Sequence, residues 1–254
     1  MALGWEGFLL VIGRISGLFI SSPVLSARQI PIQVKVLLIV MLSGMVAVVT
    51  PLTSAVPITH SAMFITALAV EIFIGYTLGF VAYVLFAGIQ LAGQLMDMQM
   101  GFGLVNVIDP QSGTQVPLIG NFNYLVAIII FLSINGHHYL LQALSNSYQM
   151  IPVLGASFNG QILEYLMQLG AHMFVIGLKL AVPVVAALFM ADLALGFIAR
   201  TVPQMNVFVV GLPFKIGAGL VMVLLTLPIF IWFTQILMDR FFGYLDGLII
   251  LLGK

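Results

Sequence analysis

The side chains whose spacing is most informative are polar and aromatic residues that recur every three or four positions between residues 79 and 97. They are Gly79, Tyr83, Phe86, Gln90, Gln94 and Asp97. Residues spaced in this way share one face of a helix. Amide and carboxylate groups are costly in hydrocarbon and usually face a bundle interior or water. The pattern favours a face that lines a passage, and the alternative is a face that packs on a partner helix through hydrogen bonds.

A second polar stripe runs through Glu164, Gln168, His172 and Lys179, with intervals of 4, 4 and 7 residues. Acidic and histidine side chains in apolar helices can relay protons. The same stripe would also suit a face between subunits or one at the level of lipid headgroups. We expect a face between subunits or at the headgroup level rather than a proton relay, because Glu164 lies near the start of its predicted helix.

Glu71 lies in an otherwise apolar run and must be paired or solvated, because a buried unpaired carboxylate is very costly. The candidate cations are Lys179, Lys215 and Arg14. The sequence leaves the choice among these three open.

Motifs of membrane-embedded enzymes are missing from the sequence. It contains no HExxH, and His137 and His138 are adjacent, so on a helix they would point about 100° apart and make a poor metal pair. The run 101–104 departs from GxGD at Leu104, and the run 155–158 departs from GxSG at Phe158. There is no cysteine for thiol or disulfide chemistry. We therefore expect no catalytic residue, no bound metal and no cofactor.

The composition requires a membrane or a large partner surface. Of the 254 residues, 62% are hydrophobic and only 6% are charged, and the mean hydropathy is +1.20. Ordinary soluble domains carry about 25% charged residues, so water alone could not cover this chain. Eight basic and eight acidic residues cancel, which gives no indication of nucleic-acid binding.

Long apolar runs separated by turn residues predict an all-α membrane protein with long kinked helices and helical hairpins. The runs cover residues 3–20, 34–49, 61–100, 124–134, 161–199 and 207–238, with an amphipathic piece at 140–151. A single helix over 61–100 would be roughly 60 Å long, twice a bilayer core. Pro183 predicts a kink. Paired glycines four apart, Gly13 with Gly17 and Gly75 with Gly79, predict close helix packing.

The segment from residue 101 to residue 121 is the least apolar part of the chain. Its turn-forming and polar residues suit a constriction or plug, and the alternative is an exposed connection. The candidate residues are Gly101, Phe102, Gly103, Asn106, Asp109, Pro110, Gln111, Ser112, Gly113, Gln115 and Pro117. Met96, Met98 and Met100 precede it and could form a flexible seal, although ordinary packing is the commoner role of methionine.

Two long stretches resemble one known family. GQLMDMQMGFGLVNVIDPQSGTQVPLIGNF, residues 93–122, is similar to the corresponding segment of the FliR family of flagellar export-gate proteins, to which virulence-secretion proteins are related. The stretch 192–215 also matches the family pattern, at Arg200, Pro203, Gln204, Asn206, Pro213 and Lys215. Arg14, Ser22-Pro23 and Glu71 match it as well. The resemblance covers nearly the whole chain.

The resemblance implies a subunit of a type III secretion export gate in the bacterial inner membrane, within the flagellar basal body. It implies a FliP-like part over residues 1–160 and a FliQ-like hairpin over residues 161–254. Several copies each of FliP and FliQ would be partners, FlhB and FlhA would be neighbours, and unfolded substrates would pass. Helices raised above the membrane would account for the unusual run lengths. The loop 101–122 would plug the closed channel, near methionines supplied chiefly by FliP.

These expectations divide the remaining polar residues into two groups. The candidates for facing the channel are Gln90, Gln94, Asp97, Met96, Met98 and Met100. The candidates for structural or inter-subunit roles are Arg14, Glu71, Lys179, Asp192, Arg200, Gln204 and Lys215. The rival hypothesis is an ion- or proton-coupled transporter with Glu71, Glu164, His172 and Asp192 as relay groups.

Overall fold

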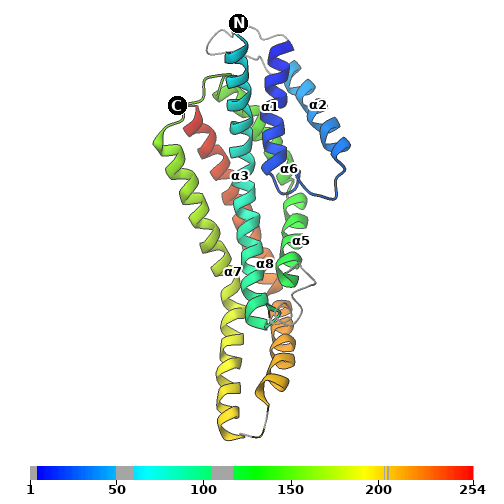
Figure 1. Ribbon diagram of the computed structural model, residues 1–254, viewed down its shortest axis with the longest axis vertical. Coiled ribbons are helices and arrows are strands. Elements are labelled where there is room, and N and C mark those ends of the chain that lie inside the picture. Colours follow the sequence, from blue (N-terminus) through cyan, green and yellow to red (C-terminus); the bar gives the residue numbers. More distant parts are fainter. Residues whose placement is uncertain (1–4, 50–59, 104–116, 203, 205, 254) are drawn as a thin grey trace. The chain divides into compact units, whose positions relative to one another are not determined.

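Residues 5–49, 60–103, 117–202, 204 and 206–253 are described by the computed structural model, and within them the structure is helical without a β-strand (Figure 1). The helices are α1 (Trp5–Ser21), α2 (Ile32–Val49), α3 (Ser61–Met100), α5 (Leu118–Ser133), α6 (Gly136–Met150), α7 (Gly160–Thr201) and α8 (Val207–Leu252). The predicted all-α membrane fold is confirmed.

Three helices are long and apolar enough to cross a membrane: α3, α7, and α8 from Val209 onward. The pair α5 and α6 would supply a fourth crossing if it is counted as one span bent by 65°. Asn135 stands at the break with a positive φ of 58°, a conformation that asparagine tolerates better than most residues. Length and composition therefore support a membrane location for these helices.

The helix α8 is longer than the apolar run from residue 207 to residue 238. It continues past Asp239 and Arg240 without interruption to Leu252. Both charged side chains are exposed, while Phe241 and Leu245 in the next turn are buried. Charges on the exposed face leave the backbone hydrogen bonds intact, so they do not end the helix. Pro213 and Pro228 also lie inside α8, and Pro183 lies inside α7.

The chain forms two compact units that do not follow the order of the sequence. Unit 1 comprises residues 1–85, 131–170 and 237–254, and unit 2 comprises residues 86–130 and 171–236. The helices α3, α7 and α8 each contribute residues to both units. The division at residue 160 into a FliP-like and a FliQ-like part rests on resemblance to other proteins, whereas the two units are defined by compact packing. The division at residue 160 stays a prediction.

In unit 1, α1 lies against α3 at glycine residues. A Cβ atom placed on Gly17 would collide with the backbone of Ile72 and Tyr76, and one placed on Gly75 would collide with the carbonyl of Arg14. Only hydrogen at these positions lets the two backbones approach so closely. The close helix packing predicted from the glycine spacing is confirmed. Leu10, Ala67 and Val153 form a buried cluster in the same unit, with Phe64, Leu68 and Leu154 packed around it.

Candidate functional site

The helix α3 stops at Gly101, where the sequence suggested that the polar segment begins. Gly101 has a φ of 93°, its N–H donates to the carbonyl of Met98 at 3.2 Å, and the N–H of Phe102 donates to the carbonyl of Asp97 at 3.1 Å. This pair of hydrogen bonds around a glycine of positive φ is the Schellman arrangement, which satisfies the last carbonyls of a helix. The backbone of Asp97 therefore holds the chain as it leaves α3.

The side chain of Asp97 holds the chain where it enters α5. Its Oδ1 accepts a hydrogen bond from the N–H of Ile119 at 3.0 Å, and its Oδ2 accepts one from the N–H of Gly120 at 3.1 Å. These amides lie in the first turn of α5, where N–H groups lack partners within the helix and the helix dipole favours an anion. Asp97 is only 6% exposed. A carboxylate from one helix thus caps the start of another.

Two glycines let α3 and α5 come together beside this cap. A Cβ atom on Gly93 would collide with the backbone of Gly120, and one on Gly120 would lie 3.1 Å from the Pro117 side chain. The helices therefore pack backbone against backbone one turn before Asp97. We call Gly93, Asp97, Phe102, Ile119 and Gly120 the Asp97 anchor. It fixes both ends of the segment between α3 and α5 at a single residue.

The structure describes only some of the predicted plug residues. Gly101 and Phe102 form the turn that follows α3, and Pro117 lies against Gly120. Gly103 is exposed, and nothing lies within 4 Å of the position that a Cβ atom would take there. Asn106, Asp109, Pro110, Gln111, Ser112, Gly113 and Gln115 lie outside the described residues. Their role as a plug stays a prediction.

The glutamines of the predicted channel face and Asp97 do not share one environment. Gln94 is exposed and Gln90 is half-buried, and the exposed stripe continues to Met98, which is 72% exposed. Asp97 is turned into unit 2 instead. A helix advances about 100° per residue, so Met98 lies about 40° from Gln94 on one side and Asp97 about 60° on the other. Docking of α5 against the second side explains why the carboxylate is covered.

The other two methionines are also covered within unit 2. Met100 is fully buried and lies against Gly219, where a Cβ atom would be 2.6 Å from the Met100 side chain. Met96 is 3% exposed, and its Sδ accepts a weak hydrogen bond from Asn123 Nδ2 at 4.0 Å. Whether any methionine contributes to a seal stays a prediction.

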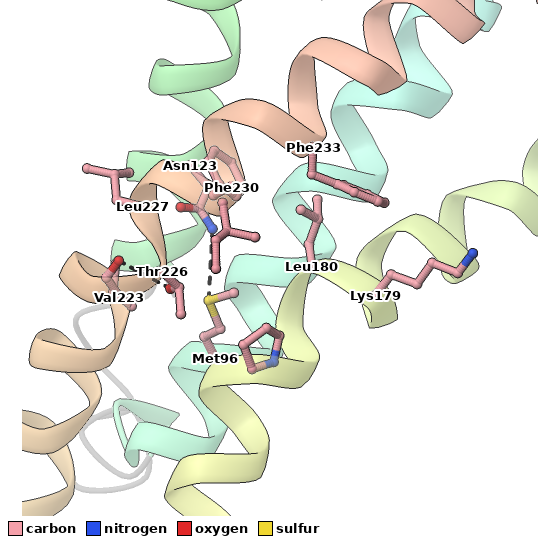
Figure 2. A pocket seen from close by; sticks show the side chains of 11 residues that line it. Met96, Asn123, Lys179, Leu180, Val223, Thr226, Leu227, Phe230 and Phe233 are labelled. Carbon is pink, nitrogen blue, oxygen red and sulfur yellow. Dashed lines mark hydrogen bonds between the residues drawn. The ribbon is translucent and has the colours of Figure 1, made fainter.

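Met96 and Asn123 also line a cleft in unit 2 (Figure 2). Its walls come from α3, α5, α7 and α8 and are mostly apolar. Lys179 stands at one end, and Figure 2 shows its side chain extending away from the end where Met96 and Asn123 meet. The sequence did not indicate this cleft, because its walls come from four separate helices.

In unit 1, Arg14 is the partner of Glu71 among the three candidate cations. Its Nε and Nη2 donate to the two carboxylate oxygens, the second at 3.1 Å. The remaining donors reach Ser147 Oγ at 2.9 Å and the carbonyl of Ile151 at 3.1 Å. The guanidinium also lies 4.1 Å from the centre of the Tyr148 ring. Arg14 and Glu71 are both 0% exposed, so their charges are balanced entirely inside the chain.

A more open ion pair lies in unit 2. Lys215 Nζ is 2.9 Å from Asp192 Oδ1, and Gln99 Nε2 donates to Asp192 Oδ2 at 3.0 Å. The side chains of Lys215 and Asp192 are 20% and 38% exposed. The group joins α3, α7 and α8. Gln99 was not singled out from the sequence, and only its place on α3 near Asp97 could have suggested it.

The remaining predicted polar residues lie at the surface. Arg200 is exposed in the last turn of α7, and Gln204 is exposed in the turn that follows. Glu164 and Gln168 are exposed neighbours joined by a 3.4 Å hydrogen bond. Within the described parts of the chain, no three histidine or acidic side chains are placed to hold a metal ion.

Comparison with known proteins gives a consistent match. The family model for bacterial export proteins, family 1, matches residues 5–241. The chain is 39% identical to the flagellar biosynthetic protein FliR of Bacillus subtilis over 89% of this chain and 87% of that protein. It is 31% identical to FliR of Escherichia coli, over 93% of this chain and 90% of that protein. It is 29% identical to the secretion system apparatus protein SsaT of Salmonella typhimurium, over 69% of this chain and 68% of that protein.

Proposed function

The chain belongs to family 1 of the bacterial export proteins and is an export-gate subunit of flagellar type III secretion in the inner membrane, and we propose that it builds a channel together with FliP and FliQ. The relatives are named for flagellar biosynthesis and for a secretion apparatus. In this proposal unfolded flagellar proteins pass through the channel, and the segment 101–122 closes it at rest. FlhB and FlhA are the proposed neighbours on the cytoplasmic side.

The observation that carries the gate proposal is the Asp97 anchor. Phe102 and the start of α5 are both held by Asp97, through hydrogen bonds of 3.0 to 3.1 Å. Within the described residues, these hydrogen bonds and the contact of Gly93 with Gly120 hold α3 against α5. A segment whose two ends are held in this way could move while α3 and α5 stay in place. A gate requires such movement.

The uncovered apolar surface supports a role inside an assembly. The helix α2 exposes large apolar side chains around its circumference, among them Leu37 at 58%, Met41 at 57% and Val48 at 87%. Apolar patches of this extent mark lipid or protein contacts. We propose that FliP and FliQ, each in several copies, cover part of this surface and lipid the rest. The FliP-like part is proposed as residues 1–160 and the FliQ-like hairpin as residues 161–254.

The exposed stripe of α3 is the proposed wall of the passage. Gln90, Gln94 and Met98 leave the bundle on the same side, and two amides would be poorly accommodated by lipid tails. Uncharged amides can donate to and accept from any peptide group. They therefore suit a polypeptide that passes without regard to its sequence. Asp97, by contrast, contributes through the anchor.

Ion conductance tests the gate. Deleting residues 111–115 from the chain, in a complex reconstituted with FliP and FliQ, should produce a steady leak of ions that the unaltered complex lacks. Replacing the same five residues by Gly and Ser of equal number is the matched control, because it keeps the segment length. Unchanged conductance after the deletion, in a complex that still assembles, would count against the plug.

Co-purification separates the channel from the transporter hypothesis. A gate subunit should leave detergent extracts bound to two other small hydrophobic proteins, identified by mass spectrometry as FliP and FliQ. A functional monomer that couples transport to protons would contradict the proposal.

A further inference from the structure

Lys179 is a cation without an ion-pair partner among the described residues. Unit 2 holds two described carboxylates, and both are engaged elsewhere: Asp97 with the amides of α5, and Asp192 with Lys215. Lys179 is exposed on α7, and its neighbours Leu178 and Val182 are each 57% exposed. Among the described residues, the Lys179 ammonium is therefore open to an anion that binds at the surface of α7.

The cleft beside Lys179 is apolar over most of its length. Leu180, Pro183, Phe230 and Phe233 line it, and Lys179 marks one end (Figure 2). Apart from Lys179, its polar lining is limited to Asn123 and Thr226. A helix is about 10–12 Å across, whereas an acyl chain is thin enough to lie between the side chains of neighbouring helices. The shape and lining favour a hydrocarbon chain attached to an anion.

The position of Lys179 along α7 agrees with the edge of a membrane. From Lys179 to the end of α7 at Thr201 is roughly 33 Å of helix at about 1.5 Å per residue, close to a hydrocarbon core of about 30 Å. Trp232 on α8 is 61% exposed and adjoins Phe233, which lines the cleft with Lys179. Lysine and tryptophan both favour the membrane–water interface. Within this stretch Asp192 and Lys215 neutralise each other, and Arg200 lies near its far end.

We propose that this cleft binds one anionic phospholipid, with an acyl chain between α7 and α8 and the phosphate at Lys179. The lipid would fill the apolar space and place a phosphate beside the Lys179 ammonium. The site does not depend on the channel or on the plug segment, because it stands on unit 2 alone.

Native mass spectrometry of the intact export-gate complex, reconstituted with FliP and FliQ in nanodiscs that contain phosphatidylglycerol, tests the site. Lys179→Gln should reduce the retained phosphatidylglycerol at least fivefold relative to the unaltered complex. Arg240→Gln removes one exposed cation from α8 and should leave retention unchanged. Equal retention by Lys179→Gln and the unaltered complex, or an equal loss with Arg240→Gln, would overturn the proposal.

A second variant separates the cleft from the charge. Leu227→Trp fills the cleft and keeps Lys179, so it should also reduce retention of the lipid while the complex still assembles. The chain has no cysteine, so Leu227→Cys gives one thiol at a defined place in it. A photoreactive phosphatidylglycerol should label the Leu227 region. Capture of FliP or FliQ by a thiol crosslinker at this position, without lipid labelling, would assign the cleft to a partner helix and overturn the lipid site.

Discussion

Two buried charged centres in this chain solve the same physical problem in different ways. In unit 1 the Glu71 carboxylate is neutralised by the Arg14 guanidinium, which also reaches Ser147 and Ile151. In unit 2 the Asp97 carboxylate has no described cation beside it and is held by two backbone N–H groups of α5. In the first centre a carboxylate is paired with a guanidinium, and in the second a carboxylate is paired with the N-terminus of a helix.

The difference indicates what each centre is suited to do. A buried ion pair that also satisfies a hydroxyl and a carbonyl locks three helices, and it leaves an uncompensated charge if either partner is lost. A carboxylate on a helix N-terminus makes two charge-assisted hydrogen bonds and joins only two segments. We therefore expect unit 1 to be intolerant of change at its charges, and the Asp97 anchor to weaken by degrees.

The largest effect is expected from breaking the ion pair on one side only. Arg14→Met leaves Glu71 buried without its cation, and Glu71→Met does the reverse, so each should cost about 3–5 kcal/mol. The double variant should recover most of the loss, because it removes both charges. Thermal midpoints of the purified complex and the amount accumulated in membranes measure this. Losses in the double variant equal to the sum of the single losses would contradict the pairing.

The next effect concerns the glycines that set the two helix contacts. Gly75→Ala in unit 1 and Gly93→Ala in unit 2 would each place a methyl group on a neighbouring backbone, at an expected cost of about 1–3 kcal/mol. Gly170→Ala is the matched control on α7, because nothing lies within 4 Å of its Cβ position. Alanine there should stabilise the helix by up to about 1 kcal/mol. If Gly170→Ala lost as much stability as the other two variants, the losses could not be assigned to the helix contacts at Gly75 and Gly93.

A graded effect is expected at Asp97. Asp97→Ala leaves the amides of Ile119 and Gly120 without acceptors, a loss of about 1–3 kcal/mol or about 5- to 150-fold in local opening. Asp97→Asn keeps one acceptor oxygen and should lose less, and Asp97→Lys should lose most because a cation meets the positive end of α5. Hydrogen exchange of these amides measures the order. Charge reversal should also impair secretion more than expression, and equal loss of both would make the anchor purely structural.

The smallest effect is expected at the partly exposed ion pair of Asp192 and Lys215. Where water reaches the pair, Lys215→Met should change stability by no more than about 1 kcal/mol. Added salt should reduce the difference further, since mobile ions screen exposed pairs. A loss comparable to that of Arg14→Met would show that this pair is buried in the assembly.

The sequence allowed the helices and some of their limits to be predicted, because apolar runs, Gly101 and the paired glycines carry local signals. It also placed Arg14 among the possible partners of Glu71. Ser147 and Ile151 could not be foreseen, because they stand 133 and 137 residues from Arg14 and nothing local marks them. The side of α3 to which Asp97 turns was equally hidden, since it depends on where α5 docks.

The anchoring of two chain directions at one residue has a mechanical consequence. The hydrogen bonds of Phe102, Ile119 and Gly120 all end on Asp97. A pull at either end of the segment between α3 and α5 therefore loads hydrogen bonds at this one residue. A polypeptide that passes through the proposed channel would therefore strain the hydrogen bonds at Asp97 before it displaces the helices α3 and α5.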